Sequence, residues 1–281
     1  MGIVRPSSMR SLLLAYPGED ECRAALATLR WPDGFRCPTC GGERAGRVAA
    51  RSLITCGGCG RQVSVTTDTD LHRHHLPLTT WFAAAWLAGT APGGNTTRLM
   101  RELSVGRRTA HEVLARLRPA MARTLTAPLA GVVEADEAFL GRREHQSTVE
   151  VLVEARKDGR VRMGVVPGQT MSVLTPFIAS RVEPGSTIRT DGWKGYNALS
   201  RAGFTHERIV HRPGWVERGE RSTPYADEAI SAVKRWILAV YNKPPTPANL
   251  DLYLAEFCFR REFRDPGAAF EALLRGLVTP R

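Results

Sequence analysis

The most specific chemical pattern in the sequence is a set of four cysteines. Cys37 and Cys40 are separated by two residues, Cys56 and Cys59 repeat that spacing, and fifteen residues lie between the two pairs. Two thiolates on one tight turn can point at a single ion, and two such turns complete a tetrahedral site. Because four thiolates leave no coordination position open, we predict that these cysteines bind a structural Zn²⁺ within a zinc ribbon.

Three aspartates suggest a metal site of a different kind. We expect Asp136 inside a strand, Asp191 directly after another strand, and Asp227 on a long helix that follows. Mg²⁺ is a hard cation that prefers oxygen ligands and keeps waters and substrate phosphates in its shell. Converging carboxylates that hold two Mg²⁺ or Mn²⁺ ions can activate an oxygen nucleophile and stabilise the leaving oxygen of a phosphodiester. This ordered set therefore predicts metal-dependent phosphodiester chemistry.

Hydrophobic periodicity predicts the elements that position these aspartates. Strands are expected over residues 132–140, 149–154, 161–166, 186–190 and 206–211, and helices over residues 171–180, 196–202, 225–240 and 249–262. In a ribonuclease-H-like sheet the first and fourth of these strands are neighbours, which brings Asp136 beside Asp191. We therefore predict an α/β fold with a ribonuclease-H-like mixed sheet flanked by helices, preceded by a zinc ribbon and a helix-turn-helix segment.

Side chains next to these aspartates have less specific interpretations. Glu137 follows Asp136 and points to the opposite face of the strand, so we expect it at the surface or in a supporting position. Trp193 and Tyr196 follow Asp191 in the chain. They could stack on nucleic-acid bases, although packing under the sheet is the simpler interpretation.

A helical region between the cysteines and the strands has a DNA-reading pattern. We expect a helix over residues 78–89, a short helix over 96–103, a turn at 104–106 and a further helix over 107–121. Two helices joined by a short turn with glycine form a helix-turn-helix, although an ordinary helical hairpin has the same pattern. The residues expected to contact DNA are Arg98, Arg101, Arg107, Arg108, Thr109 and His111.

The net charge is consistent with a nucleic-acid partner. The chain has 39 Lys+Arg against 28 Asp+Glu, a formal net charge of +11 at pH 7. Residues 1–130 hold 17 of the basic and 9 of the acidic side chains, so +8 of the excess lies there. Only four of the basic residues are lysines, and such an arginine bias also arises from GC-rich coding. Charge alone therefore favours a polyanionic partner without establishing one.

Hydropathy argues against a membrane protein. The longest apolar run, residues 81–91, is shorter than the ~18 residues of a membrane span. Residues 9–15 lack the length and the small-residue cleavage site of a secretory signal. With 43% hydrophobic and 24% charged residues, the composition is that of a globular protein. We expect a cytoplasmic, nucleoid-associated protein with no membrane partner.

The chain resembles insertion-sequence transposases with an N-terminal zinc ribbon and a DDE catalytic domain, the ISXO-type group. The most specific matching segment is TDGWKGY at residues 190–196, and VEADE at residues 133–137 matches the first catalytic strand. Residues 22–40, 81–117 and 253–260 match as well. The resemblance implies cleavage and strand transfer on double-stranded DNA, at the element's terminal inverted repeats and at a target. It also implies a homo-oligomer that assembles on DNA.

The third acidic residue departs from the pattern of this family, which has a His-Thr-Asn-x-x-Glu-like segment there. Aligning on the basic residues of the helix puts Thr223 at the Thr position, Pro224 at the Asn position and Asp227 at the Glu position. Lys234 lies two helical turns after Asp227, on the same face, where it could hold a DNA phosphate. Glu228 is the rival for the third acid, and the sequence leaves this choice open.

The sequence suggests four regions and two hypotheses for function. The regions are an N-terminal helical segment (residues 1–34), the zinc ribbon (35–75), the helix-turn-helix region (76–127) and the DDE domain (128–281). The first hypothesis is a metal-dependent DNA transposase that uses the three aspartates. The alternative is a catalytically impaired transposase remnant that acts as a sequence-specific DNA-binding protein, which the altered third-acid segment would explain.

Overall fold

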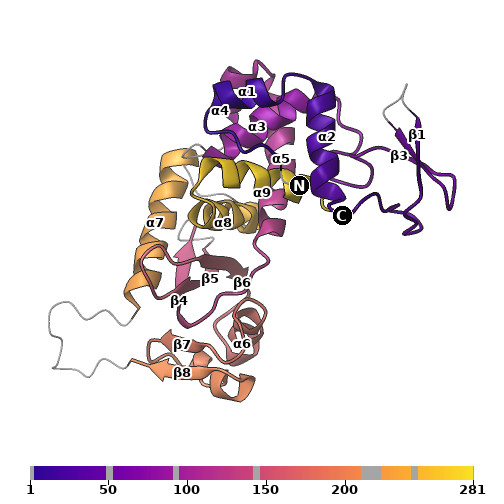
Figure 1. The fold of residues 1–281 in the computed structure, drawn as a ribbon. Helices are drawn as coiled ribbons and strands as arrows, with labels where there is room; N and C mark the ends of the chain where they lie inside the picture. Colours follow the sequence, from indigo (N-terminus) through magenta and orange to yellow (C-terminus); the bar gives the residue numbers. More distant parts are fainter. Residues whose placement is uncertain are drawn as a thin grey trace. The chain divides into compact units, whose positions relative to one another are not determined.

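The computed structural model describes residues 3–48, 53–90, 95–141, 146–209, 223–241 and 246–280 (Figure 1). The chain forms two compact units, and the N-terminal unit also includes the C-terminal residues. Unit 1 consists of Met1–Thr124 together with Phe263–Arg281, and unit 2 of Leu125–Glu262. In the described part of the chain, no helix combines the length and the apolar character needed to span a bilayer.

Unit 1 contains a small antiparallel sheet around the four cysteines. Its strands are β1 (Ala45–Val48), β2 (Leu53–Cys56) and β3 (Gln62–Val63), with β2 in the middle. Gly41 and Gly60 follow the second cysteine of each pair, and both have φ of +71°, a left-handed conformation that glycine adopts without strain. The predicted zinc ribbon is confirmed by this sheet and the two cysteine turns, and residues 49–52 between β1 and β2 lie outside the described residues.

The helices of unit 1 pack around a cluster of aromatic rings. They are α1 (Met9–Ala15), α2 (Glu19–Arg30), α3 (Leu78–Thr90), α4 (Thr96–Leu103), α5 (Arg107–Thr124) and α9 (Pro266–Val278). Phe82 of α3 lies 4.8 Å from Tyr16 and 5.6 Å from Phe270 of α9, measured between ring centroids. These three rings, from distant parts of the chain, stabilise the unit through burial and edge-to-face contact.

Helix α9 was not predicted, and it changes one domain boundary. The sequence-based boundary put residues 128–281 into one domain, whereas α9 packs against α3 and α5 in unit 1. Asp265 caps the helix by accepting the N–H of Ala268 at 2.7 Å. The contact with α5 is close: a Cβ at Gly276 would lie 2.3 Å from the carbonyl oxygen of Ala120. Only a residue without a side chain fits at that point.

Unit 2 is built on a five-stranded mixed sheet with the order β6-β5-β4-β7-β8. The strands are β4 (Val132–Leu140), β5 (Ser147–Glu154), β6 (Val161–Val166), β7 (Thr187–Thr190) and β8 (Thr205–Arg208). The first three form an antiparallel meander, whereas β7 and β8 run parallel to β4. The predicted adjacency of the first and fourth strands is therefore confirmed, and the fold class is the predicted ribonuclease-H-like α/β fold.

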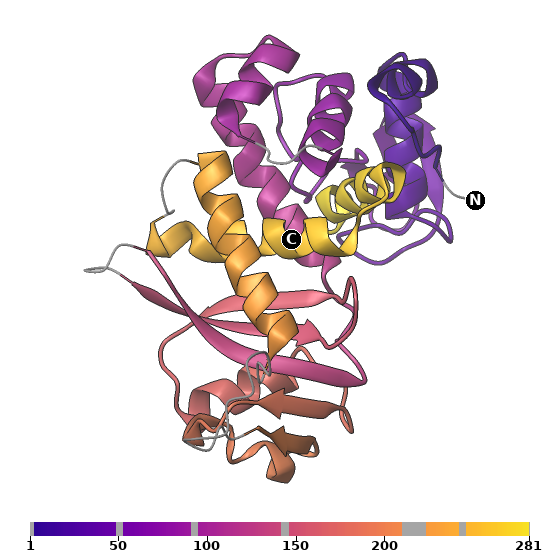
Figure 2. The ribbon, with the colours of Figure 1, turned by 90° about the vertical axis from the view of Figure 1, so that its left-hand side faces the viewer.

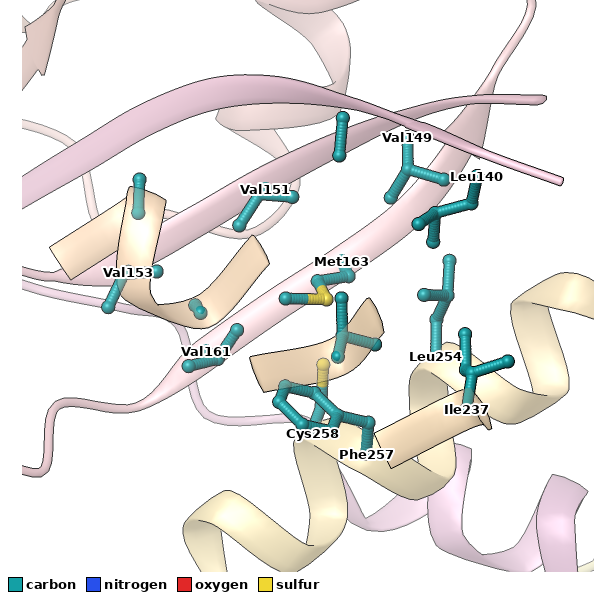
Figure 3. Close-up of a cluster of buried hydrophobic side chains, with 14 of the residues drawn as sticks. Leu140, Val149, Val151, Val153, Val161, Met163, Ile237, Leu254, Phe257 and Cys258 are labelled. Atoms are coloured by element: carbon teal, nitrogen blue, oxygen red, sulfur yellow. The ribbon is translucent and has the colours of Figure 1, made fainter. Parts of the chain in front are cut away.

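Helices cover both faces of this sheet. Helix α7 (Pro224–Tyr241) packs on β4 and β5, and α8 (Pro247–Glu262) packs on β6. Figure 2 shows α7, in orange, crossing the face of the sheet. Figure 3 shows the core between this face and the two helices, where Val151 and Met163 of the strands meet Ile237 and Phe257 of the helices. Helix α6 (Met171–Ala179) covers the opposite face.

Two predicted elements of unit 2 differ in detail from the structure. The helix predicted over residues 196–202 is instead a pair of 3₁₀ turns, Lys194–Tyr196 and Leu199–Ala202. The second turn stops at Gly203, whose φ of +89° ends the helical path. The last predicted strand, residues 206–211, is shorter as β8, and residues 210 and 211 lie outside the description.

The close contact between α5 and α9 predicts that Gly276→Ala destabilises the protein. Alanine inside a helix is normally more favourable than glycine by ~1 kcal/mol. At Gly276 the added methyl group collides with backbone, so we expect Gly276→Ala to lower the free energy of unfolding by about 1–3 kcal/mol in urea denaturation. Gly168→Ala is the control, since open space surrounds that position. A stability equal to or above wild type for Gly276→Ala would contradict the close contact.

Candidate functional site

The four cysteines converge on one point of the ribbon. Their sulfur atoms all lie within 4.8 Å of one another. Cys37 and Cys56 are buried, and Cys40 and Cys59 are exposed at the tips of their turns. Backbone N–H groups of the same turns lower the pKa of Cys37 to about 6 and also lower the pKa of Cys56. These N–H groups favour thiolates at Cys37 and Cys56, the form that binds Zn²⁺, whereas hydrogen bonds from the neighbouring cysteines raise the pKa of Cys40 to about 12 in the absence of metal. Four converging sulfur atoms fit a structural zinc.

The sheet of unit 2 brings Asp136 and Asp191 to the same level. Strands β4 and β7 are parallel, with Glu134 opposite Arg189 in the register. Continuing that register by two residues places Asp136 beside Asp191, which directly follows β7. Asp227 lies in the first turn of α7, the helix that crosses β4. Three separate elements thus carry the three predicted aspartates to one region.

Electrostatics shows that the three carboxylates interact. Burial raises the pKa of Asp136, and the negative charges of Asp191 and Asp227 raise it further. The N–H of Glu137, at 2.8 Å from Asp136 Oδ1, opposes this rise. A divalent cation would relieve the repulsion, and carboxylate oxygens are suitable ligands for Mg²⁺ or Mn²⁺. The group is more open than the cysteine cluster, which alone among the described residues has three or more ligand atoms within 4.8 Å.

Contacts distinguish Asp227 from its neighbour Glu228. The Glu228 carboxylate forms a two-pronged ion pair with Arg261 of α8, with distances of 3.1 and 2.8 Å. The charge of Asp227, in contrast, acts on Asp136. Thr223, directly before α7, also approaches Asp136, and its hydroxyl lies 3.5 Å from Asp136 Oδ2. The structure therefore brings Asp227 into the acidic group and pairs Glu228 with another helix, while Lys234 is exposed farther along α7.

Glu134 was not predicted as a residue of this region. It is fully buried on β4, two residues before Asp136. Its carboxylate accepts the backbone N–H groups of Tyr225 and Ala226 at the start of α7, at 2.7 and 3.0 Å. The alternation of the strand places it on the same face as Asp136. An acidic residue at that spacing was the available signal, but its partner on α7 is visible only in the folded chain.

A second acidic pair lies on the opposite face of the sheet. Glu137 and Glu150 are directly opposite each other on β4 and β5. Burial raises the pKa of Glu137 to about 7 and that of Glu150 well above its usual range. The Tyr196 hydroxyl donates to Glu150 at 3.2 Å. Glu137 is therefore half-buried rather than a surface residue, and Tyr196 packs under the sheet, whereas Trp193 remains 47% exposed.

The helical pattern of the predicted DNA-reading region is confirmed. Helix α4 ends at Ser104, which has a left-handed φ of +53°, and α5 begins three residues later. Ala110, Val113 and Leu117 of α5 are buried. Of the predicted DNA-contacting residues, Arg98 and Thr109 are half-buried, and the exposed ones are Arg101, Arg107, Arg108 and His111. Their exposure leaves them available to a partner.

The pairs that these arginines form are local and exposed. Arg101 contacts the adjacent Glu102 at 2.9 Å, and Arg108 contacts Glu112 one turn later at 3.1 Å. Exposed ion pairs of this kind contribute little to stability, with typical values of ~0–1 kcal/mol. A DNA phosphate could therefore replace either acidic partner at small cost.

Comparison with known proteins connects the regions that hold the cysteine cluster and the acidic group to one family. Residues 128–262 match the family model of the ISXO2-like transposase domain, and residues 17–62 match that of the transposase zinc-ribbon domain. A protein in transposable element ISH50 of Halobacterium salinarum is 29% identical over 283 residues, covering 88% of this chain and 93% of that protein. A transposase-like protein of Haemophilus influenzae is 36% identical over 53 residues, covering 19% of this chain and 43% of that protein.

Among solved structures, a chain of the simian T-cell lymphotropic virus intasome in complex with a PP2A regulatory subunit is similar at 16% identity. Its TM-score is 0.32, with coverage of 57% of this chain and 67% of that chain, which is too low to define a shared fold. The two family models carry the assignment, because together they span more than half of the chain. The chain therefore belongs to the insertion-sequence transposases that combine an N-terminal zinc ribbon with an ISXO2-like transposase domain.

Proposed function

We propose that this protein is an active DNA transposase that cleaves and joins phosphodiester bonds at the ends of an insertion sequence. Asp136, Asp191 and Asp227 would hold two Mg²⁺ or Mn²⁺ ions in a two-metal site. The proposal is supported by the convergence of β4, the end of β7 and the first turn of α7, which brings Asp191 and Asp227 close enough to act on the buried Asp136 carboxylate. Such mutual repulsion is typical of carboxylates gathered to bind a cation.

In the proposed site, the metal ions would supply the chemistry, and the side chains would bind the ions and the DNA. When bound, two such ions activate an oxygen nucleophile, water in cleavage and a 3′-hydroxyl in joining, and stabilise the leaving oxygen. The three carboxylates supply the negative charge that holds cations where the DNA backbone must approach. Lys234, two helical turns after Asp227 and exposed, would bind a DNA phosphate beside the site.

Double-stranded DNA would be held by the N-terminal half of the chain. The excess of +8 over residues 1–130 and the exposed arginines of α4 and α5 support phosphate contacts there. A zinc ion in the ribbon would fix the two cysteine turns relative to each other. Because two element ends must be processed together, we propose a homo-oligomer on DNA that acts in the cytoplasm, at the nucleoid.

The second candidate function is that of an impaired remnant that binds DNA without cleaving it. Asp227 stands where the family pattern has Glu, and Pro224 stands where it has Asn. Aspartate is one methylene shorter, so its carboxylate would reach a metal only if the start of α7 lies closer to β4. Sequence-specific binding to the element's ends without cleavage in any divalent cation would favour this function.

Substitution of the acidic residues tests the catalytic proposal. We expect Asp191→Asn and Asp227→Asn each to lower Mg²⁺-dependent nicking of end-containing DNA by roughly 100-fold or more, because each removes a charge that holds a cation. Glu228→Gln, which changes the adjacent residue, should keep nearly wild-type nicking. Equal nicking by wild type and Asp191→Asn would refute the site. Loss of nicking in Asp191→Asn and Glu228→Gln, with nicking retained in Asp227→Asn, would reassign the third acid.

Metal analysis tests the ribbon. Purified protein should contain about one equivalent of Zn²⁺ per chain, and Cys40→Ser should lose most of it because one of four thiolates is gone. Cys22→Ala is the control, since Cys22 is buried in α2 and outside the cluster. Zinc contents that are equal in wild type and Cys40→Ser would contradict the assignment.

The salt dependence of DNA binding tests the helix-turn-helix. We expect the double variant Arg107→Ala, Arg108→Ala to bind more weakly and to reduce the slope of log K against log salt by about 2, one for each lost phosphate contact. Arg10→Ala removes an exposed arginine of α1 and should leave the slope unchanged. If both variants change the slope equally, the contacts are diffuse and this motif does not read DNA.

A further inference from the structure

We propose that Glu134 is a positioning residue that sets the spacing of the three aspartates. With Arg189 and the backbone N–H groups of Tyr225 and Ala226 it forms what we call the acid anchor. The anchor connects β4, β7 and α7, the same three elements that carry Asp136, Asp191 and Asp227. This inference rests on the proposed metal site and assigns a role to side chains that do not bind metal themselves.

The central carboxylate of the acid anchor is fully buried and lies within 3.5 Å of each of its three partners. Glu134 has no exposed surface, and its Oε2 accepts the N–H of Tyr225 at 2.7 Å and that of Ala226 at 3.0 Å. Its Oε1 lies 3.5 Å from a guanidinium nitrogen of Arg189 on β7. One carboxylate therefore contacts the neighbouring strand and the covering helix at once.

The first turn of α7 depends on this carboxylate for its hydrogen bonds. The first four N–H groups of a helix have no partner within it. Here Pro224 has no N–H, Tyr225 and Ala226 donate to Glu134, and the N–H of Asp227 bonds to the Thr223 carbonyl at 2.9 Å. The negative charge also lies at the positive end of the helix dipole. The start of α7 is thus fixed to β4 rather than to solvent.

Each strand member of the anchor lies two residues before an aspartate. Glu134 precedes Asp136 on β4, and Arg189 precedes Asp191 at the end of β7. Residues two apart on a strand share a face and are ~6.6 Å apart. On α7, Asp227 directly follows Ala226. A shift of the anchor would therefore move all three aspartates relative to one another, and with them the distances that a pair of metal ions requires.

A purely structural role is the competing explanation, and the chain offers a matched control for it. Glu154 of β5 is equally buried, at 3% exposure. It accepts the N–H of Ala130 at 3.3 Å and pairs with Arg156 and Arg160, both at 2.6 Å. Although its backbone pairs with β4, its side chain contacts none of the three elements that carry the aspartates among these partners. Losing either glutamate should destabilise unit 2, but only the loss of Glu134 should change metal binding.

The test measures metal binding by thermal unfolding rather than by activity. Zinc-loaded full-length protein is titrated with Mn²⁺, and the rise in unfolding temperature gives a binding midpoint. We expect Glu134→Ala to raise the midpoint about 10-fold, the size seen for residues that orient metal ligands. Glu134→Gln keeps a carbonyl oxygen for the two N–H groups and should have an intermediate midpoint. It also keeps the test valid if the alanine variant does not fold.

Three outcomes decide the proposal. A raised midpoint for the Glu134 variants, with an unchanged midpoint for Glu154→Ala, supports the acid anchor. A lower unfolding temperature in zero Mn²⁺ with an unchanged midpoint for Glu134→Gln overturns it. A midpoint that is equal in wild type and Asp191→Asn overturns the metal site and the anchor together. Normal Mn²⁺ binding combined with absent nicking would reject only the catalytic function.

Discussion

The parallel pairing of β4 with β7 is the constraint on which the rest of unit 2 depends. It places two carboxylates side by side at one level of a sheet, although 54 residues separate Asp136 from Asp191 in sequence. Burial is the largest cause of the raised pKa of Asp136, and the like charges of Asp191 and Asp227 raise this pKa further. This proximity of carboxylates is stabilised by the burial of the sheet on both faces and by the hydrogen bonds of Glu134 to the first turn of α7.

Positive charge and the acidic group lie in different parts of the sequence. The +8 excess of residues 1–130 can attract DNA, whereas the acidic group in the proposed site would repel it. A bound divalent cation would reverse the local sign and turn repulsion into attraction. In the zinc ribbon, backbone N–H groups of the two cysteine turns lower the pKa of Cys37 and of Cys56, which favours the thiolate form that binds Zn²⁺. The chain thus carries two possible donor sets, the thiolates of the ribbon and the carboxylates for which we propose a catalytic role.

Local patterns were enough to predict most elements, and tertiary contacts explain the remainder. Strands β4 and β6 have the predicted bounds because their apolar residues are buried by helices on both faces. Helix α9 begins with a cap and a proline that the sequence displays, yet its membership of unit 1 depends on tertiary packing against α2, α3 and α5, which includes the close approach of Gly276 to Ala120. The ion pair of Glu228 with Arg261 spans two helices, so no local pattern could separate Glu228 from Asp227.

The central claim is that Asp136, Asp191 and Asp227 form a metal site. Anomalous scattering from crystals grown with Mn²⁺ tests it most directly, because the signal locates the ion independently of activity and of stability. We expect Mn²⁺ peaks in contact with the carboxylates of Asp136 and Asp191, with Asp227 completing the group. Peaks at Glu137 and Glu150 on the other face of the sheet, or no peak beside Asp136 in an otherwise ordered crystal, would contradict it.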